Sequence, residues 1–195
     1  MSNTAKSPEK YLSIHGWFDY EDLYSKVYED LGDTAHIAEV GCWLGRSACF
    51  MGELIKNGGK QVRFDCIDLW RHPRTEWSDA LIKGNKENQT SDFVSNLDMA
   101  GVLETVNVIQ LSSLEAVNVY ADQSLDFIFI DNDHSEEHVF EELNAWWPKL
   151  KKGGTLAGHD YSEEHWPGVV NAVKRFAKSK RKKHSVMNNS YLMVK

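Results

Sequence analysis

The stretch AEVGCWLGRS, residues 38–47, joins a short apolar run to the start of a helical pattern. A buried strand has no need of the carboxylate of Glu39 or of two glycines, Gly41 and Gly45, directly after it. Glycines at a strand-to-helix turn let backbone N–H groups come close to a ligand. The spacing is ExGxxxG, which is neither the GxGxxG dinucleotide fingerprint nor a phosphate loop. The stretch therefore predicts a ligand-binding turn without an obvious pyrophosphate, the alternative being a glycine turn with an incidental surface acid.

Strand and helix patterns alternate on both sides of this turn. We expect strands over the ranges 36–40, 61–70, 106–111, 125–131 and 153–161, the last opening from a turn. We expect helices over the ranges 20–32, 46–59, 91–101 (capped at Ser91), 113–120, 135–150 and 166–183. Two short strands about Asn188-Asn189 close the chain. This order predicts a doubly wound, Rossmann-like α/β fold, with a mostly parallel seven-stranded sheet and an antiparallel C-terminal hairpin.

The domain organisation follows from composition. Residues 1–10 are small, polar and charged, which predicts a disordered tail. Residues 11–195 show no break and are expected to form one domain. The polar range 71–90 interrupts the strand–helix alternation and is expected to be an insertion that acts as a lid.

Charge and cysteine content limit the classes of partner. The 195-residue chain has a net charge of −7, which argues against a general nucleic-acid binder. The segment 174–183 carries seven basic residues in ten; a solvated helix end is favoured over a patch for an anionic partner. No apolar run suits a membrane span, and three cysteines without a CxxC pair suit reduced thiols, so a cytoplasmic protein is expected. A homo-oligomer remains open.

A second acid stands at the end of the second expected strand. Asp68 follows Gly45 by 23 residues, about where doubly wound folds place a carboxylate that binds ribose hydroxyls. Trp70 beside it suits stacking on a base, although a tryptophan near a strand end more often belongs to the core. Two acids at neighbouring strand ends, Glu39 and Asp68, fit an adenosine ligand with a positive amino-acid tail. That ligand is S-adenosylmethionine (SAM).

Several stretches carry a resemblance to a known family: GWFDYEDLY, VGCWLGRSACF, FIDNDHSEEHV, WWPKLKKGGTLAGHDY and PGVVNAV. The chain resembles class I SAM-dependent methyltransferases, and more narrowly the methyltransferase-24-like family. This family is related to metal-dependent sugar O-methyltransferases of macrolide and aminocoumarin pathways. The resemblance implies that the methionine side of the cofactor is lined by Glu39, Gly41, Trp43, Gly45, Arg46 and Ser47. It further implies that Asp68 holds the ribose with Leu69 and Trp70 nearby, and that Leu111 and Ser112 border the adenine.

The chemical centre is expected beyond the fourth and fifth strands. Asp131, Asp133 and His134 follow one buried strand, and His159 and Asp160 follow the next. Parallel neighbours lie about 4.8 Å apart, so the two clusters should face each other. The resemblance implies a divalent metal on Asp131, His159 and Asp160. Carboxylates suit Mg²⁺ or Ca²⁺, whereas a histidine in place of an acid favours a softer ion such as Mn²⁺.

The catalytic prediction is methyl transfer to a hydroxyl of a small-molecule acceptor, with a sugar as one candidate. His134 or Asp133 is the candidate base; His134 is favoured because histidine titrates nearest neutral pH. The alternatives are that Asp133 caps the following helix and that His134 forms a hydrogen bond within the loop. Two other functions stay open: a metal-independent N-methyltransferase that uses Asp131, and a SAM- or nucleotide-binding module without turnover.

Overall fold

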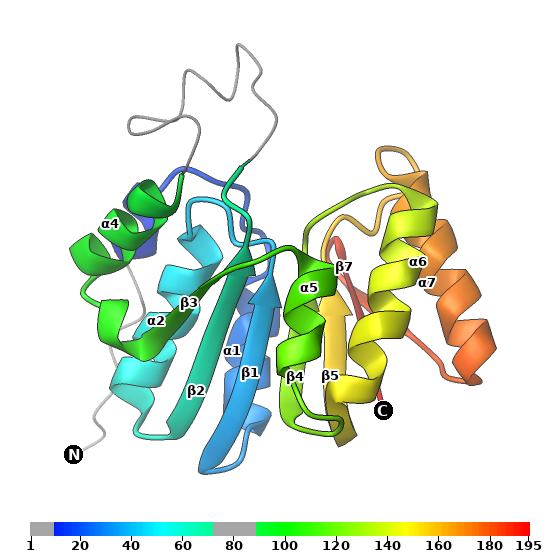
Figure 1. The fold of residues 1–195 in the computed structure, drawn as a ribbon, viewed down its shortest axis with the longest axis horizontal. Helices are drawn as coiled ribbons and strands as arrows, with labels where there is room; N and C mark the ends of the chain where they lie inside the picture. Colours follow the sequence, from blue (N-terminus) through cyan, green and yellow to red (C-terminus); the bar gives the residue numbers. More distant parts are fainter. Residues whose placement is uncertain (1–9, 72–88) are drawn as a thin grey trace.

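The computed structural model describes residues 10–71 and 89–195. One seven-stranded sheet has the order β3-β2-β1-β4-β5-β7-β6 (Figure 1). Its strands are β1 (Thr34–Val40), β2 (Gln61–Asp68), β3 (Val106–Gln110), β4 (Leu125–Ile130), β5 (Leu150–Gly158), β6 (Ser185–Met187) and β7 (Ser190–Val194). Strands β1 to β5 pair in parallel, whereas β7 pairs antiparallel with both β5 and β6. The predicted fold class is confirmed.

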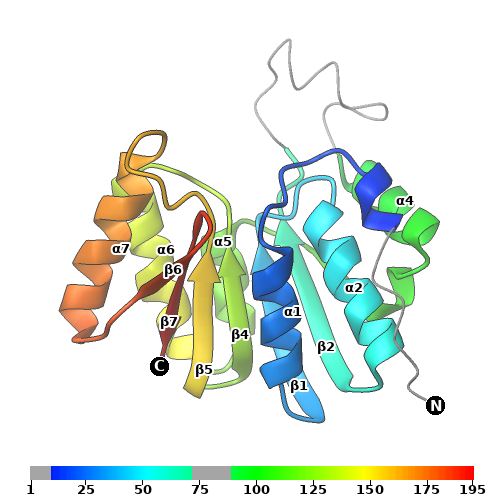
Figure 2. The same ribbon diagram turned by 180° about the vertical axis from the view of Figure 1, so that it is seen from behind.

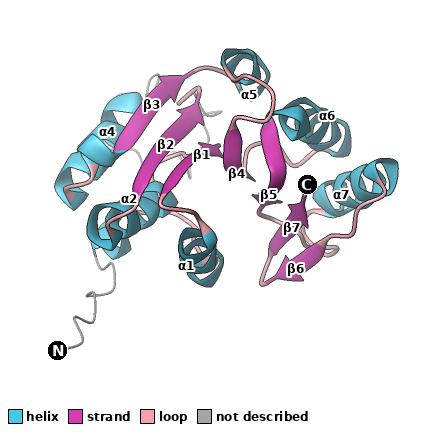
Figure 3. Ribbon diagram, turned by 90° about the horizontal axis from the view of Figure 1, so that it is seen from below, coloured by secondary structure: helices cyan, strands magenta, loops and turns pink. Residues whose placement is uncertain are grey.

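Helices cover both faces of the sheet (Figures 1, 2 and 3). They are α1 (Glu21–Asp30), α2 (Arg46–Gly58), α4 (Thr90–Ala100), α5 (Ser113–Ala116), α6 (Glu136–Trp146) and α7 (Pro167–Lys180). The apolar sides of α1, α2 and α4 form one core with the sheet, and those of α5, α6 and α7 form a second core on the opposite face. Each helix thereby buries one stripe of apolar side chains, which is the main contribution to its stability.

The strand order reverses next to β1. The chain runs from β1 outward to β2 and β3, then returns to place β4 on the other side of β1. The connections that follow β1 and β4 therefore leave the sheet in opposite directions and open a crevice at the carboxyl ends of these strands, where doubly wound folds bind ligands. This edge is at the top of Figure 1.

Several expected element boundaries differ from the structure: β2 ends at Asp68 and not at residue 70, β5 ends at Gly158 and not at residue 161, and the helix expected over 113–120 is α5 followed by the 3₁₀ helix Val117–Val119. Two further differences have a visible structural reason. Helix α4 begins at Thr90, and Ser91 is not its cap: the buried residue Gln89 precedes it and donates its N–H to the carbonyl of Trp70. The turn expected at Gly153-Gly154 lies inside β5 instead. Gly154 is required there because a Cβ would press on the carbonyl oxygen of Asp126 in the neighbouring strand, where the β4–β5 register shifts.

Other expectations have different outcomes. The three cysteines are free and buried, as expected. Among the described helices, none is both long and apolar enough to cross a membrane. The expected tail and lid fall almost wholly on residues 1–9 and 72–88, which lie outside the described residues; Lys10 itself begins a short 3₁₀ helix.

Candidate active site

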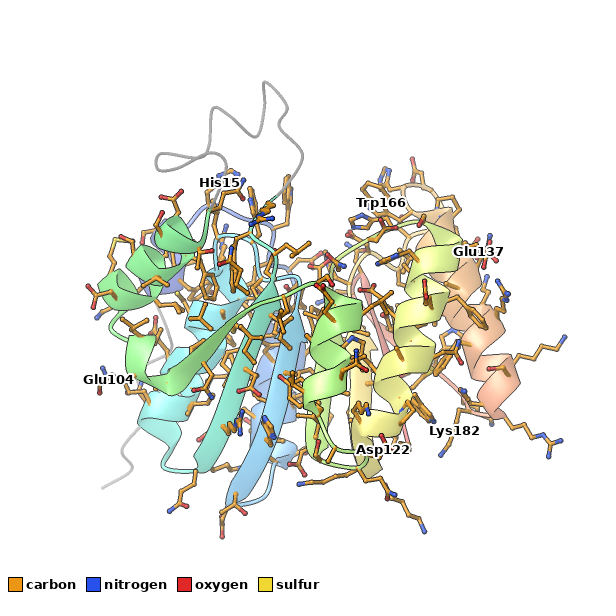
Figure 4. The ribbon with its side chains drawn as sticks, in the orientation of Figure 1. His15, Glu104, Asp122, Glu137, Trp166 and Lys182 are labelled. Carbon is orange, nitrogen blue, oxygen red and sulfur yellow. The ribbon has the colours of Figure 1, made fainter. Side chains whose placement is uncertain are left out.

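A cavity of about 930 Å³ opens at the carboxyl ends of β1, β4 and β5. Its described walls are the segments 15–20 and 41–47, the residues that follow β4 and β5, and the side chains of Trp166 and Asn189. Figure 4 places His15 and Trp166 at this same edge of the molecule, whereas Asp122 and Lys182 lie at the opposite edge. The cavity is thus where the strand order predicts a ligand.

The glycine turn forms one wall of the cavity. Gly41 and Gly45 have φ angles of 86° and 84°, in the left-handed region that favours glycine. A Cβ on Gly41 would overlap the carbonyl oxygen of Asp131, and a Cβ on Gly45 would meet the ring of Phe93 at 2.8 Å. Close packing against Asp131 and Phe93 therefore already requires these glycines. The sequence predicts a different reason, the close approach of a ligand to the backbone.

Asp68 fixes the shape of this turn. Its Oδ2 accepts hydrogen bonds from the N–H groups of Cys42 and Trp43, both at 2.9 Å, and its Oδ1 accepts one from Trp70 N–H at 2.7 Å. The carboxylate is 7% exposed. One side chain at the end of β2 thus holds the backbone that leaves β1.

Glu39 lies beneath the turn and is buried. Its Oε1 accepts a hydrogen bond from the Ser47 hydroxyl at 2.6 Å, and its Oε2 accepts one from the Tyr24 hydroxyl at 3.0 Å. Burial raises the pKa of Glu39 to about 7, against the opposing effect of these hydrogen bonds. Glu39 therefore supports the cavity wall from behind through Ser47, which lines the cavity.

A cluster of carboxylates and imidazoles lies at the ends of β4 and β5, as the sequence predicts. His134 Nε2 is 2.6 Å from Asp160 Oδ2. His159 Nδ1 is 3.4 Å from Asp160 Oδ1 and 3.8 Å from Asp131 Oδ2. Asp160 has a φ of 59°, uncommon for a residue other than glycine. Asp131 and His134 follow Ile130, and His159 and Asp160 follow Gly158. These side chains lie close together because Ile130 and Gly158 are paired in neighbouring strands.

A family model described as a methyltransferase domain, Methyltransf_24, matches residues 38–161, more than half of the chain. The chain belongs to this methyltransferase family. The match begins before the glycine turn and ends after the second acidic cluster, so it spans both walls of the cavity. The predicted class I SAM-dependent methyltransferase is confirmed. No curated protein sequence matches the chain significantly.

Several solved structures have a similar fold but low sequence identity to this chain. The O-methyltransferase NovP superimposes with a TM-score of 0.71 at 13% identity, covering 90% of this chain and 79% of NovP. An O-methyltransferase from Bacillus cereus in complex with SAH superimposes with a TM-score of 0.59 at 16% identity, covering 93% of this chain and 83% of the Bacillus cereus chain. CalS11 is described as a TDP-rhamnose 3′-O-methyltransferase of calicheamicin biosynthesis. It superimposes with a TM-score of 0.59 at 14% identity, covering 89% of this chain and 76% of CalS11. These likenesses confirm the fold.

The candidate cofactor residues of the methyltransferase divide into two groups. Those that line the cavity are Gly41, Trp43, Gly45, Arg46 and Ser47. Those outside the described lining are Glu39, Asp68, Leu69, Trp70, Leu111 and Ser112. The ring of Trp70 is fully buried against Phe93, so it serves the core here and not the base stacking that its position suggested. The Ser112 hydroxyl accepts from Glu115 N–H and caps α5.

The candidate catalytic residues differ in their surroundings. Asp133 is exposed and accepts hydrogen bonds from the backbone N–H and the hydroxyl of Ser135, so it shapes the loop before α6. His134 is partly buried, and its ring stacks on Trp166 with centroids 4.1 Å apart. The hydrogen bond with Asp160 outweighs burial and raises the pKa of His134. His134 lines the cavity, whereas Asp133 is not part of its described lining.

The charges of the cluster depend on one another. Burial raises the pKa of Asp131 to about 6. Burial also disfavours a charged His159, but Asp160 and Asp131 outweigh it and raise the pKa of His159 to about 9. Burial opposes ionisation of Asp160, yet its hydrogen bonds with both histidines hold its pKa well below the usual range. The protonation states of these two imidazoles and two carboxylates therefore depend on one another.

The donor set fits a divalent cation. Ligand atoms of Asp131, His134 and Asp160 all lie within 4.8 Å of one another. The predicted metal set contained His159 in place of His134. His159 lies beside the same two carboxylates, but its Nε2 is 2.8 Å from Asp19 Oδ1. Both histidines are therefore within reach of the carboxylates, and either set offers the hard oxygen donors that Mg²⁺, Mn²⁺ or Ca²⁺ accept.

Asp19 and Asn189 also line the cavity, although neither is among the predicted site residues. Asp19 lies in GWFDYEDLY, which carries the family resemblance, and Asn189 lies in the predicted turn of the C-terminal hairpin. No local pattern identifies them, since Asp19 meets His159 across 140 positions of the chain.

Proposed function

We propose that the methyltransferase transfers the methyl group of SAM to a hydroxyl of a small-molecule acceptor, a sugar included, with a divalent metal at Asp131 and Asp160. The observation that carries this proposal is the pairing of these carboxylates with His134 on the floor of the cavity that the glycine turn borders. A carboxylate–imidazole centre suits the activation of a hydroxyl, which must lose a proton.

The cofactor would lie along the glycine turn. The first N–H groups of α2 have no acceptor within the helix, and a helix start attracts a carboxylate such as that of methionine. Arg46 lines the same wall, and its buried Nε makes no hydrogen bond among the described residues. Asp68 and Glu39 would act mainly by holding this wall in place, and Asp68 would also accept hydrogen bonds from the ribose hydroxyls.

Proton transfer would be the task of His134. With Nε2–H donated to Asp160, the Nδ1 atom is the nitrogen left to accept the hydroxyl proton. The oxygen then forms its bond to the methyl carbon as the carbon–sulfur bond breaks, and S-adenosylhomocysteine leaves. A bound divalent ion would lower the pKa of the acceptor hydroxyl. Holding both reactants in line would supply a large part of the rate.

The rim of the cavity suits a ring-shaped acceptor. Trp17 is 63% exposed and stacks on Trp43, and Trp166 is 41% exposed and stacks on His134. Indole faces pack well against the apolar faces of rings. The sugar acceptor named for CalS11 is consistent with this choice.

The test measures S-adenosylhomocysteine release with a panel of sugar, phenol and amine acceptors. EDTA-treated enzyme is compared with the same enzyme resupplied with Mg²⁺, Mn²⁺ or Ca²⁺. We expect turnover on a hydroxylated acceptor that EDTA abolishes and a divalent ion restores. Turnover on amines alone, unaffected by EDTA, would overturn the proposal, and so would SAM binding without turnover on any acceptor.

A further inference from the structure

Asp19 connects two distant parts of the chain at the cavity wall. It belongs to the segment that precedes α1, and its side chain is 49% exposed. Its Oδ1 lies 2.8 Å from His159 Nε2, and its Oδ2 accepts a hydrogen bond from Asn189 Nδ2 at 2.8 Å. Each carboxylate oxygen of Asp19 thus has a separate partner, one at the chemical centre and one in the C-terminal hairpin.

The hairpin turn holds Asp19 from the other side. Asn188 has a φ of 52°, which suits the turn between β6 and β7, and its Nδ2 donates to the backbone carbonyl of Asp19 at 2.9 Å. The carbonyl of Asn189 accepts a hydrogen bond from Tyr161 N–H at 2.8 Å, directly after Asp160. Two asparagines that only shape a turn would not need these contacts, so the turn also fixes the position of Asp19.

The contact with Asp19 sets the direction in which His159 faces. With Nε2 directed at Asp19, the Nδ1 atom faces Asp160 and Asp131. The ring of Tyr20 packs beside that of His159, with centroids 4.9 Å apart, and His159 is only 9% exposed. The imidazole therefore has little room to turn over.

Histidines that bind metals commonly donate their second ring N–H to a carboxylate, which fixes both the tautomer and the ring orientation. We infer that Asp19 is a positioning residue of this kind: it holds His159 with Nδ1 directed at the space between Asp131 and Asp160, and the Asn188-Asn189 turn holds Asp19. His159 then serves as the nitrogen ligand, which leaves His134 for the proton. The inference rests on the proposed metal-assisted function.

The experiment measures Mn²⁺ affinity by the electron paramagnetic resonance signal of free Mn²⁺, on the full chain. The variants are Asp19→Asn, which is nearly isosteric, Asp19→Ala and Asn189→Ala. The matched control is Asp33→Asn, which changes an exposed aspartate just before β1. Loss of an outer carboxylate typically lowers metal affinity by about 10–100-fold. We expect this loss for Asp19→Ala, a smaller loss for Asp19→Asn and Asn189→Ala, and no change for the control.

A second readout separates positioning from a merely structural role. Long-range ¹H–¹⁵N spectra, with His159 assigned through His159→Gln, should show Nε2 protonated in the Mg²⁺-loaded protein and a mixture of tautomers in Asp19→Ala. Unchanged Mn²⁺ affinity in folded Asp19→Ala and Asp19→Asn would overturn the inference, as would wild-type protein that binds no divalent ion. Calorimetry with SAM on the wild-type protein tests the methyltransferase proposal separately, because it measures binding of the cofactor and not of the divalent ion.

Discussion

Ser47 donates its hydroxyl to Glu39 at 2.6 Å, so a carboxylate buried under the glycine turn is tied to the first turn of α2. Glu39 is 1% exposed, and burial raises its pKa to about 7 from 4.5. An acid whose pKa is higher in the folded chain than in the unfolded chain keeps a proton that unfolding releases. This carboxyl therefore makes stability depend on pH.

The first prediction concerns that pH dependence. Between about pH 4.5 and 7 the folded chain holds more protons at Glu39 than the unfolded chain, so the free energy of unfolding falls as pH rises through this window. The decrease from this group is roughly 3 kcal/mol. Glu39→Gln should remove that part of the decrease, measured by urea unfolding at pH 5 and pH 8. Glu104→Gln, at an exposed site, is the control; equal slopes for wild type and Glu39→Gln would contradict the prediction.

The second prediction compares two glycines with similar backbones. Gly41 and Gly59 have φ angles of 86° and 78°, but a Cβ on Gly41 would overlap the Asp131 carbonyl, whereas a Cβ on Gly59 meets nothing within 4 Å. Gly59→Ala should cost about 1–2 kcal/mol from backbone strain alone. Gly41→Ala should cost at least about 3 kcal/mol or prevent folding, because the backbone must shift as well. Urea unfolding measures both losses of stability. Similar losses for the two variants would contradict the prediction and show that the Asp131 loop moves away at little cost.

The third prediction separates two roles of Asp68. Asp68→Ala leaves three backbone N–H groups without their acceptor, at about 1–3 kcal/mol for each buried group, so the protein should be less stable and bind SAM more weakly. Asp68→Asn keeps one acceptor oxygen for the turn but loses the charge. If Asp68 also binds the ribose, Asp68→Asn should weaken SAM binding by about 1–3 kcal/mol, measured by calorimetry. Wild-type affinity in Asp68→Asn would limit Asp68 to holding the turn.

The fourth prediction concerns the two candidate bases. His134→Ala should lower turnover by about 10²–10⁴-fold, the usual contribution of a general base, and leave SAM affinity within twofold. Asp133→Ala removes the hydrogen bonds from Ser135 and should lower turnover far less. Steady-state release of S-adenosylhomocysteine gives both numbers. A larger loss of turnover in Asp133→Ala than in His134→Ala would assign the proton transfer to Asp133. A loss of SAM affinity in His134→Ala that equals its loss of turnover would make His134 structural.

The parts of the structure that follow local patterns were predictable. Alternating strands and helices fix the sheet, because apolar periodicity decides which segments are buried. Neighbouring parallel strands also bring Asp131 and Asp160 together, since both follow the ends of paired strands. The prediction for Trp70 carried two options, and the neighbouring ring of Phe93 decides for the core.

Contacts between distant segments were not predictable from local patterns. Asp19 reaches His159 only because the segment before α1 crosses the end of β5, and no local spacing encodes that crossing. The Gly153-Gly154 pair has the composition of a turn, but the shifted register beside Asp126 places it inside a strand. In both cases a tertiary approach outweighs the local preference.

The tight fit of Gly41 against the carbonyl of Asp131 has a mechanical consequence. Asp131 N–H also donates to Val40 O at 2.8 Å, so the exits of β1 and β4 are joined by a hydrogen bond and by direct backbone contact. We therefore expect a ligand that displaces one exit to strain the other, which would couple occupancy on the two sides of the cavity through this backbone contact.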